Sequence, residues 1–331
     1  MLERYGTFRA LCTPMPIKNV VIISVGAVLI VAGMVWYAFS THETKDLSVS
    51  LTNPVADLVE NKNLSIGARV ALQDALKVFA EESISQEDIA NYGIYYRELI
   101  SGPVIALNQE EGFFPASLLK LPVAMWYFKK AELDPTILSN QIHFSGPKGV
   151  TEGHFVSSRL VVPGTTYTIE ELIEFMLTES DNDATQILVE YAGGREVINE
   201  VYRDVGIRDV DNYDTYVIDT HTYAAFFRVL FNAEYLDQES SERILSLLTK
   251  TSFNQGLKAN IPESVSVAHK FGERTIDPSV PVDQLHDCGV VYVPENPYLV
   301  CVMTQGVDYD RMAEFIGAVS EMIYKEASKG S

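Results

Sequence analysis

Two residues three positions apart, Ser117 and Lys120, have the types and the spacing of a serine nucleophile and its lysine base. A serine hydroxyl attacks a carbonyl group when a neighbour takes its proton, and a lysine can do so when burial or a second cation lowers its pKa. An apolar run follows the serine, which predicts a helix start where backbone N–H groups suit an oxyanion. Alone the motif is weak, because a serine often caps a helix, and Ser145 and Lys148 repeat the spacing around a Gly-Pro pair that disfavours a helix.

Two further polar sets occur once each and follow in order along the chain. Ser180-Asp181-Asn182 ends a helical run, so its serine and its amide can serve as a proton carrier and as a holder of a substrate carbonyl. Lys270-Phe271-Gly272 lies in a run with the period of a strand, where its lysine can lower the pKa of Lys120 and its glycine permits close backbone approach. Taken singly, they are typical of a capping turn and of a surface lysine. Their order and their elements favour one shared site.

The elements that must position these residues alternate in type along the chain. Apolar residues with the period of strands occur at both ends of the region after residue 65, and helical periods dominate between them. We expect helices at 68–81, 118–199 (with interruptions), 222–231, 240–250 and 311–327, and strands at 91–99, 103–108, 264–272 and 288–304. This order predicts an α/β (α+β) domain whose sheet is assembled from both ends, with a separate helical lobe and a cleft between the lobes.

The ordered set S-x-x-K, S-D-N and K-x-G resembles that of the class A β-lactamases and the related penicillin-binding proteins, and the likeness extends over about residues 65–324. The resemblance implies a two-lobed fold with an antiparallel sheet flanked by helices and an all-helical lobe. It also implies these roles: Ser117 as nucleophile, Lys120 as its base, Ser180 as proton carrier to the leaving nitrogen, Asn182 as binder of the acyl side chain, Lys270 as partner of the substrate carboxylate, and the backbone N–H groups of Ser117 and Glu273, beside Gly272, as the oxyanion hole.

The chain departs from the family pattern at two places. The family uses a loop glutamate after S-D-N to activate the deacylating water, whereas residues 201–233 contain no glutamate. Asp211 and Asp214 are candidates to replace it, although solvation of a loop is the commoner role of such residues. Phe271 stands where the family usually has a threonine or serine that helps to bind the substrate carboxylate. Arg274 can compensate by a charge-assisted contact, or it is a surface residue.

These features predict a serine hydrolase that is acylated by a β-lactam or by a peptidoglycan stem peptide. Fast deacylation would make it a β-lactamase, and slow deacylation a D-alanyl-D-alanine peptidase, a transpeptidase or a non-catalytic sensor.

The formal net charge of −20 disfavours nucleic acid as a partner. The six histidines show no metal-binding spacing, and nothing indicates a cofactor.

The first residues predict a single-pass anchor in the cell membrane. Residues 20–39 carry no charged side chain, a length that matches the hydrocarbon thickness of a bilayer. Basic residues precede this run, so we expect residues 1–18 in the cytoplasm, a membrane helix at 19–40, a linker at 41–64 and the catalytic domain at 65–331 outside. A cleaved signal peptide is the alternative, but the apolar run is long and no A-x-A site follows it.

Two of the three cysteines, Cys288 and Cys301, fall on neighbouring strands of one expected hairpin. With a turn centred on the sequence PENP, Cys301 should face Val290 rather than Cys288. We therefore expect buried thiols, with a disulfide as the alternative.

Overall fold

A computed structural model describes Thr52 and residues 64–100, 102–148, 153–155, 157, 159–277 and 280–330. The predicted cytoplasmic segment and membrane helix lie outside these residues, as does nearly all of the predicted linker. Within the described part of the chain, no helix has both the length and the apolar character needed to cross a bilayer.

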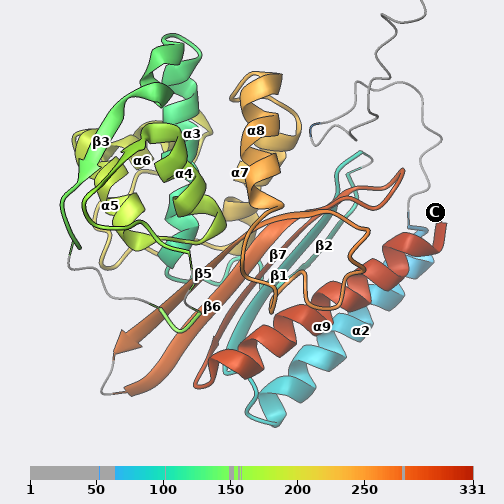
Figure 1. The fold of residues 1–331 in the computed structure, drawn as a ribbon. Helices are drawn as coiled ribbons and strands as arrows, with labels where there is room; N and C mark the ends of the chain where they lie inside the picture. The colour runs from blue at the N-terminus through green and yellow to red at the C-terminus, as the bar shows by residue number, and fades with distance from the viewer. Residues whose placement is uncertain are drawn as a thin grey trace, which may run out of the picture. The chain divides into compact units, whose positions relative to one another are not determined.

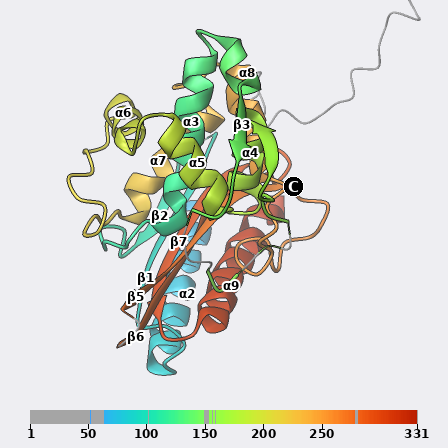
Figure 2. The ribbon, with the colours of Figure 1, turned by 60° about the vertical axis from the view of Figure 1, so that its left-hand side comes forward.

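A five-stranded antiparallel sheet forms one lobe, in the order β2-β1-β7-β6-β5. Its strands come from the two ends of the domain, as expected: β1 (Asn91–Glu98), β2 (Val104–Leu107), β5 (Val267–Asp277), β6 (Val280–Val291) and β7 (Tyr298–Gly306). Two long helices, α2 (Ile66–Ser85) and α9 (Tyr309–Ala327), lie side by side on one face of this sheet (Figures 1 and 2).

The other lobe is largely helical and lies against the opposite face of the sheet (Figure 1). Its elements are the 3-10 turn η1 (Ala116–Leu119), α3 (Lys120–Ala131), the 3-10 turn η2 (Pro135–Ser139), β3 (Gln141–Phe144), β4 (Thr165–Thr168), α4 (Ile169–Thr178), α5 (Asn182–Tyr191), α6 (Glu196–Asp204), α7 (Thr220–Phe231) and α8 (Gln238–Leu248). A short 3-10 turn, η3 (Ser328–Gly330), follows α9.

The central strand β7 shows why the sheet needs cover on both faces. Val300 and Val302 point into the apolar core beneath α2 and α9, whereas Leu299 and Met303 point into the core shared with the helical lobe. Because both faces are buried, the strand reads as an almost continuous apolar run rather than as a polar and apolar alternation. The edge strand β5 lies beside the helical lobe, where it can contribute to a site.

The helices α2, α7, α8 and α9 each begin two residues earlier than expected, and an aspartate caps the last three of them; α2 also ends four residues later. The Asp219 side chain accepts a hydrogen bond from the Thr222 backbone N–H at 2.8 Å, so α7 begins at Thr220 rather than at Thr222. The expected helical region also contains an unpredicted pair of strands on either side of residues 145–164, in which β3 pairs with β4. Each of these strands has four residues, which is too short for a clear periodic pattern.

The predicted register of the last hairpin was wrong. Val290 pairs with Leu299, and Cys288 lies opposite Cys301, with which it forms a buried disulfide. The turn is centred between Pro294 and Glu295, one residue earlier than assumed, and this shift moves each cross-strand partner by two residues. The cysteines are therefore not free thiols.

Candidate active site

Ser117 lies in the turn η1, whose backbone is held tightly by its neighbours. The preceding residue, Ala116, has a φ of 49°, a left-handed conformation that costs a residue with a side chain about 1–3 kcal/mol. The hydroxyl of Tyr223 on α7 donates a hydrogen bond of 2.9 Å to the Leu118 carbonyl. From the sheet, Gly272 approaches so closely that a Cβ atom there would lie 3.0 Å from the Leu118 nitrogen. The serine is thus fixed between both lobes.

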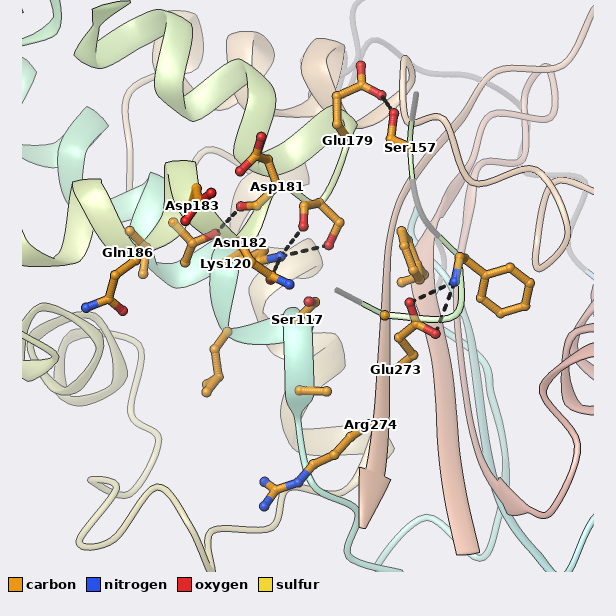
Figure 3. A pocket seen from close by; sticks show the side chains of 18 of the residues that line it. Ser117, Lys120, Ser157, Glu179, Asp181, Asn182, Asp183, Gln186, Glu273 and Arg274 are labelled. Carbon is orange, nitrogen blue, oxygen red and sulfur yellow. Dashed lines mark hydrogen bonds between the residues drawn. The ribbon is translucent and has the colours of Figure 1, made fainter. Parts of the chain in front are cut away.

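Lys120 is the first residue of α3 and points its amine at the S-D-N triplet. Its Nζ atom donates to the Ser180 hydroxyl at 3.0 Å and to the Asn182 side-chain oxygen at 2.7 Å, and it also contacts the Ser180 carbonyl. Among the described residues, the Ser117 hydroxyl accepts no hydrogen bond from Lys120 or Lys270. The side chains of the first two motifs therefore meet, with Ser117 lying beside them (Figure 3).

Lys270 reaches the same hydroxyl from β5. Its Nζ atom donates to Ser180 Oγ at 2.9 Å and to the Phe271 carbonyl at 2.8 Å. Ser180 is placed between the two lysines by a backbone φ of 55°, which turns the chain sharply between α4 and α5. Three stretches that are distant in sequence thus converge on one hydroxyl, as the motifs predict.

Burial lowers the pKa values of both amines, and the charge of Lys270 adds to the effect on Lys120. Burial lowers the pKa of Lys120 well below its ordinary value, and the charge of Lys270 lowers it further, against the opposing effect of Asp181 and Glu273. Burial likewise lowers the pKa of Lys270 to about 7, with Asp287 and Glu273 opposing this shift. At neutral pH, Lys120 can therefore act as a base while Lys270 is partly protonated.

Asp181, the middle residue of the S-D-N triplet, holds the turn before α5 through its carboxylate, and only its capping contact was expected from the sequence. Its carboxylate caps α5 by accepting from the Ala184 N–H at 2.8 Å, and its other oxygen accepts from the Val161 N–H at the same distance. The residue is only 2% exposed. An aspartate directly before a helical run is a known capping signal, so the first contact was predictable, whereas the second depends on tertiary structure.

The side chains of Glu273 and Arg274 point away from β5 in different directions. The Glu273 carboxylate accepts from the backbone N–H groups of His154 at 2.9 Å and Phe155 at 3.1 Å. The Arg274 guanidinium lies 4.2 Å from the centre of the Phe114 ring, beside η1. Sequence analysis expected only the backbone of Glu273 to take part in the site, and nothing in the sequence indicated its side-chain contacts.

The two loop aspartates occupy different positions. Asp214 lines the cleft next to Tyr213, whose ring lies 5.1 Å from the guanidinium of Arg195. Asp211 is exposed and forms an ion pair with Arg208 at 3.1 Å, away from the residues that line the cleft. Of the two candidates for the missing glutamate, only Asp214 faces the site.

Ser117, Lys120, Ser180 and Asn182 border one cleft of about 1120 Å³, and the buried Lys270 reaches it through its hydrogen bond to Ser180. Its walls come from the helical lobe and from β5, and Figure 3 shows Ser117 between them. In the described part of the chain, no group of three or more histidine, cysteine, aspartate or glutamate residues is arranged to hold a metal ion. The arrangement has a hydroxyl, two amines with lowered pKa values and a carboxamide, which are the groups needed for acyl transfer.

A family model described as the β-lactamase enzyme family matches residues 72–327. A β-lactamase from Bacteroides uniformis is 27% identical over 180 residues, which cover 48% of this chain and 60% of that protein. The extended-spectrum β-lactamase PER-1 from Pseudomonas aeruginosa is 22% identical over 301 residues, 84% of this chain and 87% of that protein.

Solved structures share the fold. The extended-spectrum β-lactamase TLA-3 aligns with a TM-score of 0.67 at 15% identity, over 78% of this chain and 100% of that one. A mutant of PBP-A, solved as an acyl-enzyme complex with penicillin G, aligns with a TM-score of 0.62 at 24% identity, over 77% and 96% of the two chains. The predicted two-lobed fold is confirmed.

The lowered pKa of Lys270 has a consequence for stability. In the unfolded chain a lysine keeps its proton up to about pH 10.4, whereas folded Lys270 loses it at about 7. The unfolded state therefore binds more protons between these values, and the free energy of unfolding should rise with pH by at most about 1.4 kcal/mol per pH unit. We expect Lys270→Met to flatten this rise, as measured by urea unfolding at pH 7, 8 and 9.

The exposed Lys77 on α2 provides the matched control. Its Nζ atom lies 3.8 Å from Glu81, and its side chain is 60% exposed, so Lys77→Met should leave the slope unchanged. Equal slopes for the wild type and Lys270→Met would contradict the lowered pKa.

Proposed function

Because this chain belongs to the β-lactamase enzyme family, we propose that it is a serine hydrolase that forms an acyl-enzyme at Ser117 with β-lactams or D-alanyl-D-alanine-like amides. The observation that carries the proposal is that Lys120, Ser180 and Asn182 line one cleft with this serine, while the buried Lys270 donates a hydrogen bond to Ser180. The relatives named above support the reaction type, and the geometry supports the assignment of residues.

The proposed acylation begins with proton transfer from the Ser117 hydroxyl to neutral Lys120, whose Nζ atom must turn from Ser180 towards Ser117. The serine oxygen then bonds to the carbonyl carbon of the amide, and the resulting oxyanion is stabilised by the backbone N–H groups of Ser117 and Glu273. The proton passes from Lys120 to Ser180 and on to the leaving nitrogen as the carbon–nitrogen bond breaks. Water later hydrolyses the ester and restores the serine.

Recognition of the substrate would use the groups around this path. Asn182, on the first turn of α5, would hold the amide of the acyl side chain. Phe271 has no hydroxyl for the substrate carboxylate, which leaves Lys270 and Arg274 as its cationic partners. Arg274 has no acidic partner among the described residues, and its guanidinium stacks on Phe114 beside η1.

Intact-protein mass spectrometry after exposure to penicillin G tests the nucleophile. We expect one adduct with the mass of the penicillin on the wild type and none on Ser117→Ala, because only the serine oxygen can form the ester. Ser145→Ala is the matched control, since Ser145 and Lys148 have the same spacing but lie outside the helix start. Labelling that persists in Ser117→Ala, or disappears in Ser145→Ala, would contradict the assignment.

The rate of ester hydrolysis separates two forms of this function. A β-lactamase hydrolyses the ester quickly, whereas a D-alanyl-D-alanine peptidase releases β-lactams slowly. The absence of a glutamate from residues 201–233 favours the peptidase. In either form, Asp214 is the loop carboxylate at the cleft, and general-base catalysis typically contributes about 10²–10⁴-fold to a rate. We therefore infer that Asp214 activates the hydrolytic water.

Substitution of this aspartate tests the inference through the lifetime of the adduct. In Asp214→Asn, the acyl-enzyme should persist at least about tenfold longer than in the wild type, while its rate of formation stays similar. Asp211→Asn is the control and should decay at the wild-type rate, because Asp211 pairs with Arg208 outside the cleft. Equal lifetimes of the Asp214→Asn and wild-type adducts would assign the water to another group.

We also propose that residues 19–40 anchor the enzyme in the cell membrane, with the catalytic domain outside. Uncharged residues 20–39 and the preceding basic residues support this orientation. The full chain expressed in bacteria should remain in the membrane fraction after alkaline carbonate washing, and a chain that begins at residue 65 should not. A soluble product whose mass lacks the first residues would instead indicate a cleaved signal peptide.

A further inference from the structure

The Glu273 carboxylate binds the backbone of the Gly153–Phe155 segment, which lines the cleft beside β5. One oxygen accepts from the His154 N–H at 2.9 Å and the other from the Phe155 N–H at 3.1 Å. Figure 3 shows these bonds on the side of the cleft opposite Asp181 and Asn182. Hydrogen bonds to a charged acceptor are among the stronger ones in proteins, so this contact ties the segment to the sheet.

Aromatic side chains reinforce the same attachment. The Phe155 ring packs edge-on against Phe253 with centroids 4.9 Å apart, and Phe253 stacks on Phe271 at 4.2 Å. The His154 ring stacks on Tyr309 at the start of α9, with centroids 5.0 Å apart. Phe271, the unusual residue of the K-x-G motif, thus lies beneath the segment and supports it.

Gly153 is required by the same contact. A Cβ atom at this position would lie 1.9 Å from Glu273 Oε1, so any side chain would have to displace the carboxylate. The carboxylate can move only by giving up its hydrogen bonds to His154 and Phe155. The glycine and the glutamate are therefore matched, although they are 120 residues apart.

We propose that Glu273 and Phe271 are positioning residues that hold Gly153–Phe155 as the sheet-side wall of the cleft and thereby determine which substrates fit. This inference rests on the proposed function for its substrates, but the wall itself does not depend on it. The departure at Phe271 then has an explanation that it shares with Glu273, because both side chains bind the protein's own chain. A substrate carboxylate is left to Lys270 and to Arg274, which lies on the other side of β5.

Glu273 also acts on the lysines through its charge, since it opposes the lowering of the pKa of both Lys120 and Lys270. A substitution of Glu273 alone would mix this effect with the loss of the wall. Gly153→Ala separates them, because it displaces the segment and removes no charge. Hydrogen exchange of the His154 and Phe155 amides reports the attachment without any substrate.

The experiment compares amide exchange in the full-length wild type, Gly153→Ala, Glu273→Ala and the double variant. Each single variant should exchange at His154 and Phe155 about tenfold or more faster than the wild type, the effect of losing charge-assisted hydrogen bonds. The double variant should exchange no faster than Glu273→Ala, because without the carboxylate the added methyl group meets no obstacle. Glu314→Gln, on the exposed side of α9, is the control and should match the wild type.

Kinetics then test the link to substrate selection. Gly153→Ala should raise the KM for penicillin acylation several-fold with a smaller change in kcat, the pattern of lost binding rather than lost chemistry. Phe271→Thr should loosen the same amides. If the His154 and Phe155 amides of Gly153→Ala exchanged at the wild-type rate, or if the effects of the two single variants were additive, the proposal that Glu273 holds this segment would be wrong. Faster exchange with unchanged KM would overturn its role in selection, and an inactive wild type would refute only the proposed function.

Discussion

Two buried amines share a single hydroxyl, and the rest of the site depends on that constraint. Lys120 and Lys270 donate to Ser180 Oγ from opposite lobes at 3.0 and 2.9 Å, and both side chains are almost completely buried. Two ammonium groups at this separation cannot both stay charged at low cost in a buried site. At least one of them must release its proton near neutral pH, which creates a base without any histidine.

The fold maintains this unfavourable pair by directing nearby acids elsewhere. The Asp181 carboxylate accepts hydrogen bonds from two backbone N–H groups, and the Glu273 carboxylate does the same on the other side of the cleft. If either carboxylate moved into direct contact with a lysine, the ion pair would raise the pKa of that lysine and the base would be lost. The hydrogen bonds that fix the cleft walls thus also keep the pKa values of the two lysines low.

Sequence reasoning predicted the motifs and the lobes because both depend on local rules. The spacing in S-x-x-K and the strand period around Lys270 are set by backbone geometry, so they can be identified without coordinates. The contact between Glu273 and the segment that begins at Gly153 could not be identified in this way, since no local sequence rule links the two positions. The register of Cys288 failed for a related reason, because a one-residue error in the turn moves every pair across the hairpin by two.

The site therefore separates into parts with different physical constraints. The lysines and Ser180 lie in a buried network, where a change in one group alters the pKa of the others, so substitutions there affect the whole reaction. Asp214 is exposed on the loop between α6 and α7, and the side chains of Phe271 and Glu273 contact the cleft wall at Gly153–Phe155. In the proposed mechanism, release of the acyl group and choice of substrate can accordingly change by substitution while acylation is preserved. The departures of this chain from its family occur in those more tolerant parts.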